Sequence, residues 1–305
     1  MGMELIETLY SAEKPSAIAL GCFDGLHLGH QKVISCALHA EGLVPSVFTF
    51  DENPLRALCG NPPPMLMTNE RKAELLRDMG VAQLYRIPFS SLMGVEAEDF
   101  IEKILIGQCR ARKICCGYNF RFGRGGKGEE HLLRQVCAAH GVEVAIVPPI
   151  CDASGPVSSS RIREALKAGA VENAAEMLGR PFGYDFEVVH GRHLGTVMGT
   201  PTINQRFPEG FILLKFGVYA SVCHIDGRVF YGVTNIGKKP TVGSAEVLSE
   251  TWIPEYSGNL YGRQIAVELL SFIRPEQKFE NLAALQAEIR KNGAEAEKIA
   301  RKHGY

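Results

Sequence analysis

The chain has 305 residues, of which 46% are hydrophobic and 22% charged, and its formal net charge at pH 7 is −1. This composition excludes a mainly disordered chain and supplies enough apolar residues for two domains of ordinary size. The nearly balanced charge argues against nucleic acid as a partner, because neutralising many phosphates requires a strong basic excess.

The N-terminal segment has no basic stretch followed by an apolar run, and no later stretch has the roughly 20 apolar residues needed to cross a bilayer. We therefore expect a cytoplasmic protein without a membrane partner. Its nine cysteines are scattered, and we expect them to be reduced and mostly buried. Cys137 and His140 are spaced like two ligands on one helix, but zinc would need two more.

In the first half of the chain, short apolar runs alternate with segments that carry apolar residues at helical spacing. The expected strands are 16–22, 43–50, 82–87, 112–117 and 142–148, and the expected helices are 30–41, 69–79, 95–106 and 129–140. This alternation predicts β-α-β units around a parallel sheet, with helices on both faces. Ligands of such sheets bind beyond the carboxyl ends of the strands, so the residues after each strand are the first candidates for a site.

A helix expected at 171–178 ends this half, and the pattern changes beyond about Gly179. Strands then follow one another between clusters of Gly, Pro and Asn, which is typical of an antiparallel barrel. The expected strands are 186–190, 211–214, 217–225, 228–234, 247–252 and 264–272, and an amphipathic helix at 279–302 follows them. We expect two domains, residues 1–180 and 181–305.

The first candidate site follows the first expected strand. Residues 21–30 read Gly-Cys-Phe-Asp-Gly-Leu-His-Leu-Gly-His and deliver His27 and His30 to the start of a helix. Free N–H groups and the helix dipole at such a position favour phosphate, and glycines allow close approach of the backbone. Imidazoles can donate hydrogen bonds to the charge that develops on a transferring phosphoryl group. A histidine in so short a pattern is more commonly a cap or a core residue, but its position after the first strand favours catalysis.

Two further segments carry groups that suit phosphates. Residues 117–126 combine glycines, aromatic rings and two arginines, and they could equally form a purely structural loop. Residues 157–163, Val-Ser-Ser-Ser-Arg-Ile-Arg, open a helix with hydroxyl groups and two arginines. Alone, this segment would be interpreted as an ordinary helix cap followed by a solvated basic turn.

Together these segments resemble the nucleotidyltransferase superfamily and, more closely, the adenylyltransferase half of the bacterial riboflavin kinase/FMN adenylyltransferase family, also called FAD synthetase. The similarity covers most of residues 16–180 and implies a Rossmann-like fold. It also implies that the two histidines stabilise the transferring α-phosphoryl group of ATP and that residues 158–163 hold the triphosphate. The family's usual Pro-His-Pro is here Glu52-Asn53-Pro54, so position 53 offers no histidine. The implied nucleotide-binding residues are Gly21, Phe23, Asp24, Gly25, Gly29, Gly117, Asn119, Phe120, Arg121, Ser158, Ser159, Ser160, Arg161 and Arg163.

The second candidate site lies in the expected barrel. Residues 189–204 are rich in glycine but lack the Gly-Lys-Ser/Thr of a P-loop. The oxygens of Thr202 and Asn204 are hard ligands that suit Mg²⁺. A long barrel connection rich in turn residues is the alternative interpretation. The glycines that would suit a loop over phosphates are Gly191, Gly195 and Gly199.

Several short motifs between Gly217 and Gly262 resemble, in their order and spacing, the riboflavin kinase domain, over nearly all of residues 180–290. The resemblance implies a small Greek-key barrel, Mg²⁺–ATP bound at the glycine-rich loop, and Glu250 as the general base for the ribityl 5′-hydroxyl. Without the family, Glu250 would be interpreted as a solvated acid at a strand end. The loop departs from the family pattern at Thr196, Met198, Thr200 and Ile203.

The two resemblances imply one chain with two ATP-dependent activities. It would phosphorylate riboflavin to FMN and adenylylate FMN to FAD with release of pyrophosphate, so its ligands would be ATP, Mg²⁺, riboflavin, FMN and FAD. A homo-oligomer is compatible with the sequence. The alternatives are a nucleotidyltransferase for another phosphorylated acceptor, such as a phosphopantetheine or a polyol phosphate, and a flavin- or nucleotide-binding regulator with an inactive kinase domain.

Overall fold

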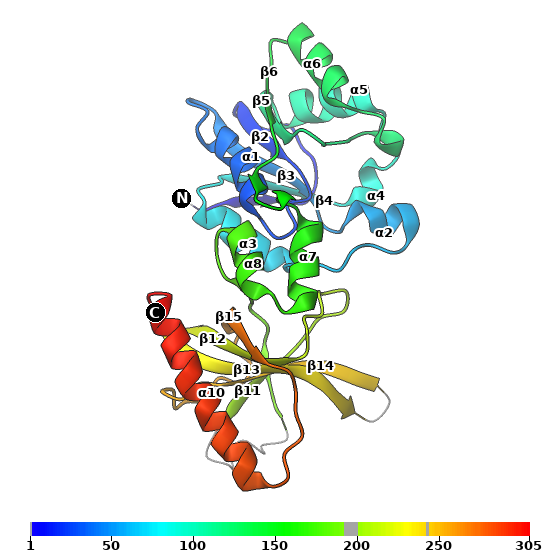
Figure 1. Ribbon diagram of the computed structural model, residues 1–305. Helices are drawn as coiled ribbons and strands as arrows, with labels where there is room; N and C mark the ends of the chain where they lie inside the picture. Colours follow the sequence, from blue (N-terminus) through cyan, green and yellow to red (C-terminus); the bar gives the residue numbers. More distant parts are fainter. Residues whose placement is uncertain (1, 192–200, 242–243) are drawn as a thin grey trace. The chain divides into compact units, whose positions relative to one another are not determined.

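The computed structural model describes residues 2–191, 201–241 and 244–305. The chain forms two compact units, Met1–Ser158 and Ser159–Tyr305 (Figure 1). Each unit is built mainly around one sheet, and the two are described separately below. No helix in the described part of the chain combines the length and the hydropathy that a membrane span requires.

The first unit contains a six-stranded sheet in the order β1-β4-β3-β2-β5-β6, and every neighbouring pair is parallel. The prediction of a parallel sheet is therefore confirmed. The edge strand β1 was not expected from the sequence, because three residues with an exposed Leu5 give no readable pattern. The strands are β1 (Glu4–Ile6), β2 (Ser16–Leu20), β3 (Val44–Phe50), β4 (Gln83–Ile87), β5 (Ala111–Gly117) and β6 (Glu143–Val147).

Helices cover both faces of this sheet (Figure 1). Strand β2 is buried throughout, and its alternating residues divide between two cores: Ile18 and Leu20 enter one, Ala17 and Ala19 the other. The helix expected at 95–106 is a short α5 that continues as a π-helix to Gln108. The helices are α1 (Leu28–Leu38), α2 (Pro54–Cys59), α3 (Asn69–Asp78), α4 (Phe89–Leu92), α5 (Ala97–Asp99), the π-helix Phe100–Gln108 and α6 (Glu130–Ala139).

The second unit contains a seven-stranded antiparallel sheet in the order β10-β11-β14-β13-β12-β15-β9. Strand β11 lies beside β14, at the end of the consecutive run β12-β13-β14, which is a Greek-key arrangement. The sheet curls until Glu187, just before β10, bridges to Gln264, just before β15. Its strands are β9 (Phe182–Tyr184), β10 (Val188–Val189), β11 (Thr202–Arg206), β12 (Gly217–Ile225), β13 (Arg228–Thr241), β14 (Ser244–Trp252) and β15 (Ala266–Arg274).

A buried glutamine holds the curled sheet together. Nε2 of Gln205 donates to the carbonyl oxygens of Phe186, at 2.6 Å, and Ile265, at 2.7 Å. These two acceptors lie beside the strands that meet at the closure, so one side chain joins both edges. The prediction of a strand at 211–214 was wrong. Phe211 and Leu214 are buried, but this segment is a connection that packs its apolar side chains without entering a strand ladder.

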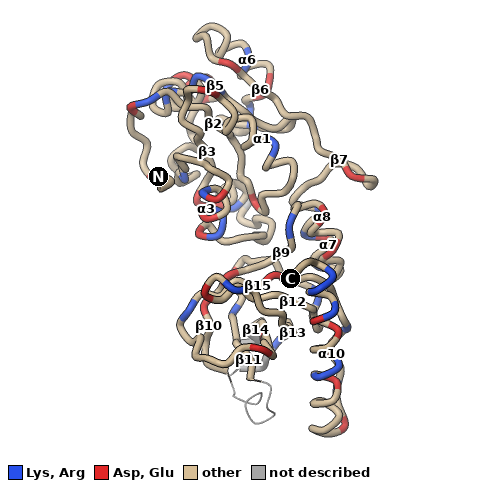
Figure 2. The backbone as a smooth tube through the Cα atoms, turned by 90° about the vertical axis from the view of Figure 1, so that its left-hand side faces the viewer, with Lys and Arg blue, Asp and Glu red and all other residues tan. Residues whose placement is uncertain are grey.

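In the described part of the second unit, three helices accompany the sheet. Helix α7 (Ser159–Ala168) pairs with α8 (Val171–Leu178), and α8 packs against β9 and β15. The long α10 (Leu282–Lys302) places Ala296 and Ala300 against the apolar face of β12, while charges of both signs alternate along it (Figure 2). By packing, the second unit thus begins at Ser159, whereas the expected domain boundary at 180/181 concerns function and stays a prediction.

Candidate active sites

The turn between β2 and α1 has an unusual backbone. Phe23, Gly25 and Leu26 adopt positive φ angles of 51°, 86° and 45°, a region that non-glycine residues rarely enter. Phe23 and Leu26 are each only 1% exposed, so burial of two large apolar side chains opposes the strain. The turn ends at His27, directly before α1.

The two predicted histidines meet at the start of α1. Nδ1 of His27 accepts a hydrogen bond from the backbone N–H of His30 at 3.3 Å, which makes His27 the N-cap of the helix. The two rings stack with centroids 3.6 Å apart, and the Phe23 ring meets His30 edge-on. Because Nδ1 of His27 accepts, the proton of the neutral ring must sit on Nε2, which can then donate to a ligand.

Burial keeps both imidazoles neutral. It lowers the pKa of His27 to about 4, and it lowers the pKa of His30 well below its usual value, with the nearby His27 and Lys72 adding to the effect. Nδ1 of His30 is buried and has no hydrogen-bond partner among the described residues. The pair therefore places neutral imidazoles at a helix N-terminus, where an oxyanion is favoured and the Nε2–H of His27 can donate to it.

Other predicted residues of the first unit lie at the same edge of the sheet. Gly21 follows β2 and Gly117 is the last residue of β5, and these two neighbouring strands pair in register through Leu20 and Cys116. A side-chain oxygen of Asp24 accepts from the N–H of Leu66, so this carboxylate fixes the turn.

Beyond β5, the predicted aromatic and basic residues have partners of their own. The rings of Phe120 and Phe122 stack, and Arg121 forms an ion pair with Glu129. Asn119 lies in the turn that follows Gly117, where the N–H of Phe120 donates back to the carbonyl of Gly117. The charge of Arg121 is thus compensated by Glu129, while its half-exposed side chain remains accessible to a ligand.

Sequence reasoning missed one charged residue at this site. Lys72 lies on α3 with a side chain that is 7% exposed, and its Nζ donates to the carbonyl of Cys22 in the β2–α1 turn. The signal was available, because Lys72 occupies the same helix face as the fully buried Leu76 four residues later.

The serine- and arginine-rich segment belongs to the other compact unit, except for its first residue. Ser158 ends the first unit, and Ser159 begins α7 and the second unit. Arg163 is 7% exposed, while Arg161 is partly exposed. The residues predicted to bind one nucleotide are therefore distributed over both units.

In the second unit, the predicted kinase residues share one row of the sheet. Asn204 on β11 is paired in register with Glu250 on β14, which in turn is paired with Asn235 on β13. Paired residues project to the same face of a sheet, and so does Thr202, two positions before Asn204. Asn235 was not singled out from the sequence, because only strand register brings it beside Glu250.

The neighbours of Glu250 along β14 point to the opposite face. The hydroxyl of Thr251 hydrogen-bonds to that of Thr234 at 2.8 Å, and Ser249 is bonded to the hydroxyl of Tyr184 at 2.6 Å. Both neighbours are fully buried, whereas Glu250 is partly exposed. The alternation of the strand thus turns the carboxylate of Glu250 out of the barrel interior.

The predicted glycine-rich loop is described only at its ends. Gly191 lies against the Asn204 amide so closely that a Cβ atom there would stand 2.5 Å from Nδ2. A larger residue at 191 would therefore displace Asn204. The predicted Gly195 and Gly199, and the departures at Thr196, Met198 and Thr200, lie outside the described residues.

The cysteine chemistry agrees with the expectation. Of the eight cysteines for which the structure gives a side-chain environment, all are free and five are buried. Among the described residues, no three His, Cys, Asp or Glu side chains gather as a metal site. Nε2 of His140 instead lies 3.2 Å from Oε1 of Glu102, so this ring interacts with a carboxylate and does not form a metal site with Cys137.

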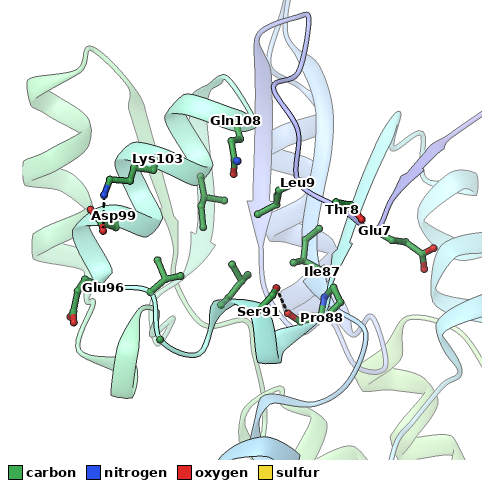
Figure 3. Close-up of a pocket in the computed structure, with 14 residues that line it drawn as sticks. Glu7, Thr8, Leu9, Ile87, Pro88, Ser91, Glu96, Asp99, Lys103 and Gln108 are labelled. Atoms are coloured by element: carbon green, nitrogen blue, oxygen red, sulfur yellow. Dashed lines mark hydrogen bonds and ion pairs between the residues drawn. The ribbon is translucent and has the colours of Figure 1, made fainter.

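A separate cavity of about 720 Å³ opens in the first unit (Figure 3). It lies between the π-helix and the segment after β1, with Leu9 and Ile87 on its wall and the ion pair Lys103–Asp99 at one side. None of the residues predicted from the sequence lines it.

Comparisons with known proteins match both halves of the chain. The family model described as FAD synthetase matches residues 10–161, and the one described as riboflavin kinase matches residues 178–300. Proteins from Listeria monocytogenes and Bacillus subtilis are both 32% identical to it, and one from Escherichia coli is 31% identical. These alignments cover 90%, 92% and 94% of this chain and 89%, 91% and 95% of the relatives. All three are described as bifunctional riboflavin kinase/FMN adenylyltransferase.

A solved structure also resembles the whole chain. It has a TM-score of 0.87 and 29% identity, and the match covers 96% of this chain and 98% of the other. That protein, from Streptococcus pneumoniae, is described as a macrolide-efflux protein. The structural match supports the two-part fold.

Proposed function

The chain belongs to the bifunctional riboflavin kinase/FMN adenylyltransferase family, and from this premise we propose which residues perform each reaction. It phosphorylates riboflavin to FMN and adenylylates FMN to FAD, with ATP as the second substrate of both reactions. Residues 1–180 carry the adenylylation and residues 181–305 the phosphorylation. Small molecules are its substrates, and the cytoplasm is its place of action.

The stacked, neutral His27 and His30 carry the proposal for adenylylation. An oxygen of the FMN phosphate attacks the α-phosphorus of ATP, and the bond from that phosphorus to the bridging oxygen breaks, so pyrophosphate leaves. No covalent enzyme intermediate is needed, because the acceptor is itself the nucleophile. The imidazole N–H groups stabilise charge on the α-phosphoryl oxygens, and positioning supplies most of the remaining rate enhancement.

The glycines and hydroxyls around these histidines hold the substrates. The turn with Phe23, Asp24, Gly25 and Gly29 lets the phosphates approach the start of α1. Residues 117–121 contact the nucleotide after β5. The hydroxyl groups and the two arginines of residues 158–163 bind the triphosphate, because guanidinium groups form paired hydrogen bonds with phosphate oxygens.

For phosphorylation, Glu250 is the general base. Its carboxylate faces away from the barrel interior, in one row with Asn204 and Asn235. It accepts the proton of the ribityl 5′-hydroxyl while that oxygen attacks the γ-phosphorus of ATP and ADP leaves. The donor set of Thr202 and Asn204 fits Mg²⁺, since a hydroxyl and an amide oxygen two positions apart on β11 share the face of Glu250. These two residues would hold the ion, which would supply positive charge to the phosphates. Gly191, which lies against the Asn204 amide, is assigned to the phosphates of this site, and the predicted Gly195 and Gly199 lie outside the described residues.

The alternatives drawn from the sequence are not favoured. A transferase for another phosphorylated acceptor would not need a riboflavin kinase domain, which the family model matches at residues 178–300. A regulator without catalysis would not need the general base and the histidine pair that the chain retains.

The experiment that tests the proposal separates riboflavin, FMN and FAD over time after purified protein is mixed with ATP and Mg²⁺. Riboflavin should yield FMN and then FAD, and added FMN should yield FAD directly. Failure to convert either flavin would contradict the assigned activities.

Two substitutions then separate the sites. Glu250→Gln should lower riboflavin phosphorylation by roughly 10² to 10⁴ and leave FAD formation from FMN unchanged. Glu255→Gln, at an exposed position just beyond β14, is the matched control and should alter neither reaction. His30→Ala should lower FAD formation only. If the Glu250→Gln protein phosphorylates riboflavin at the wild-type rate, Glu250 is not the general base.

A further inference from the structure

A buried ammonium lies behind the turn that carries the histidines. The Lys72 side chain is 7% exposed, and its Nζ donates to the carbonyl oxygen of Cys22 at 3.1 Å. Lysine is almost never buried unless it is paired, because removing its charge from water is costly. Among the described residues, the one hydrogen bond of the Lys72 Nζ goes to this neutral carbonyl, and the nearby carboxylate of Asp24 favours its charged form, so the ammonium is linked to the turn that carries both groups.

The same carbonyl is held from a second direction. The buried hydroxyl of Thr49, at the end of β3, also donates to the oxygen of Cys22 at 3.1 Å. Cys22 directly precedes Phe23, the first residue of the turn with positive φ, and the ring of Phe23 meets His30. Two donors from different elements thus fix the peptide from which the histidine-bearing turn begins.

The charge of Lys72 also acts on the imidazoles. His30 is influenced by His27 and by Lys72, both of which lower its pKa in addition to burial. Burial lowers the pKa of Lys72, whereas the nearby Asp24 and the thiol of Cys22 favour its charged form and Arg86 on β4 opposes it. A positive charge on Lys72 disfavours a second one on His30, and burial acts on that ring in the same direction, so the ring remains neutral.

We propose that Lys72 is a positioning residue for adenylyl transfer. Its ammonium holds the Cys22 carbonyl, and with it the turn that presents His27 and His30 to the α-phosphoryl group of ATP. The proposal rests on the adenylylation assigned to this half of the chain. Lys72 acts through the turn and the neighbouring rings, without contact to substrate.

Four variants separate the parts of this role. Lys72→Met removes the charge and the donor but keeps the length of the side chain. Lys72→Arg keeps the charge, and Thr49→Val removes the other donor to the Cys22 carbonyl. Arg77→Met, at an exposed position of the same helix, is the matched control. Conversion of FMN to FAD is measured as kcat and KM between pH 5 and 9, and riboflavin phosphorylation reports folding of the remainder of the chain.

We expect Lys72→Met to lower kcat for FAD formation by about 10- to 100-fold while KM for ATP stays within about threefold, because misplaced donors cost rate rather than binding. The acid limb of its pH profile should move to higher pH, since His30 then gains a proton more easily. Lys72→Arg should restore the wild-type acid limb. Thr49→Val should lower kcat by a smaller factor without moving that limb, and Arg77→Met should behave as wild type.

A Lys72→Met protein with wild-type kcat and an unshifted acid limb would overturn the proposal. If that variant loses both activities, it is unfolded, and wild-type kcat in Thr49→Val would then overturn the proposal instead. A wild-type protein that forms no FAD from FMN refutes the assigned adenylylation, a result distinct from either of these.

Discussion

The hydrogen bond from the backbone N–H of His30 to Nδ1 of His27 fixes which nitrogen of that ring carries its proton. It predicts the Nε2–H tautomer of neutral His27 from pH 8 down to about pH 5, with protonation only near its pKa of about 4. The nitrogen shifts of histidine-labelled protein report the tautomer and the titration directly. A proton on Nδ1, or a midpoint near 6.5, would contradict this cap geometry.

The same residue makes stability depend on pH. In the unfolded chain the imidazole binds a proton below its ordinary pKa of 6.5, whereas in the folded chain it does so only near 4. The contribution of His27 is therefore complete above pH 6.5 and is lost as the pH falls through that window, by on the order of 3 kcal/mol in total. Unfolding by urea at pH 7.5 and 5, followed by circular dichroism, should show a smaller pH effect in His27→Gln than in wild type. An equal pH effect in both proteins would exclude this linkage.

Among the elements, helix α10 packs against β14, the strand that carries Glu250. Gly293 of this helix lies against the ring of Trp252 on β14, and a Cβ atom there would stand 2.8 Å from Cζ3. Asn292, beside it, is buried and accepts from Nε of Arg274 at 3.1 Å, which anchors the helix to β15. The helix and β14 are therefore in close contact at a position two residues from the proposed base.

Gly293→Val should force α10 and Trp252 apart and lower riboflavin phosphorylation, while FAD formation from FMN stays unchanged. Trp252 is the one tryptophan of the chain, so intrinsic tryptophan fluorescence reports this contact alone and should shift to longer wavelength as the ring gains exposure. Ala294→Val introduces the same side chain at an exposed position of the same helix and serves as the control. Equal spectra for the two variants would show that the contact is not rigid.

The elements also show what the sequence could predict. Strands β2 and β12 carry long buried runs, and the predicted bounds lie within two residues of those observed, whereas β13 was predicted only as 228–234 and extends to Thr241. Strand β11 was hidden, because Thr202, Asn204, Gln205 and Arg206 are polar, and Asn204 and Gln205 are buried although neither is apolar. The apolar run 211–214 was assigned to a strand because burial alone cannot distinguish a ladder from a packed connection.

The candidate sites were predicted unevenly for a similar reason. His27 and His30 lie three residues apart on one turn, so their juxtaposition follows from local geometry. Asn235 joins its site through strand register, which a single sequence does not reveal, and although the helix pattern could have shown that Lys72 is buried, its bond to the Cys22 carbonyl depends on long-range packing.

At the scale of the whole molecule, the two compact units predict two separable unfolding transitions. Gln205→Leu removes the donor to two buried carbonyls at the closure of the second sheet, and each unsatisfied acceptor costs about 1–3 kcal/mol. Calorimetry should therefore show one transition moving to lower temperature and the other staying in place. The adenylylation rate of this variant at 25 °C should match wild type, and a joint shift of both transitions would show that the units unfold as one.

Helix α7 begins with proposed triphosphate-binding residues, whereas α8 packs against strands of the second unit. The segment assigned to the triphosphate opens α7, yet α8 packs against β9 and β15 through a face that includes Val171, Ala174 and Leu178. A fragment ending at Ser158 would lack the arginines, and one ending at residue 180 would leave that apolar face without its partner strands. Point substitution can therefore isolate either reaction, whereas cutting the chain yields no soluble adenylylating fragment.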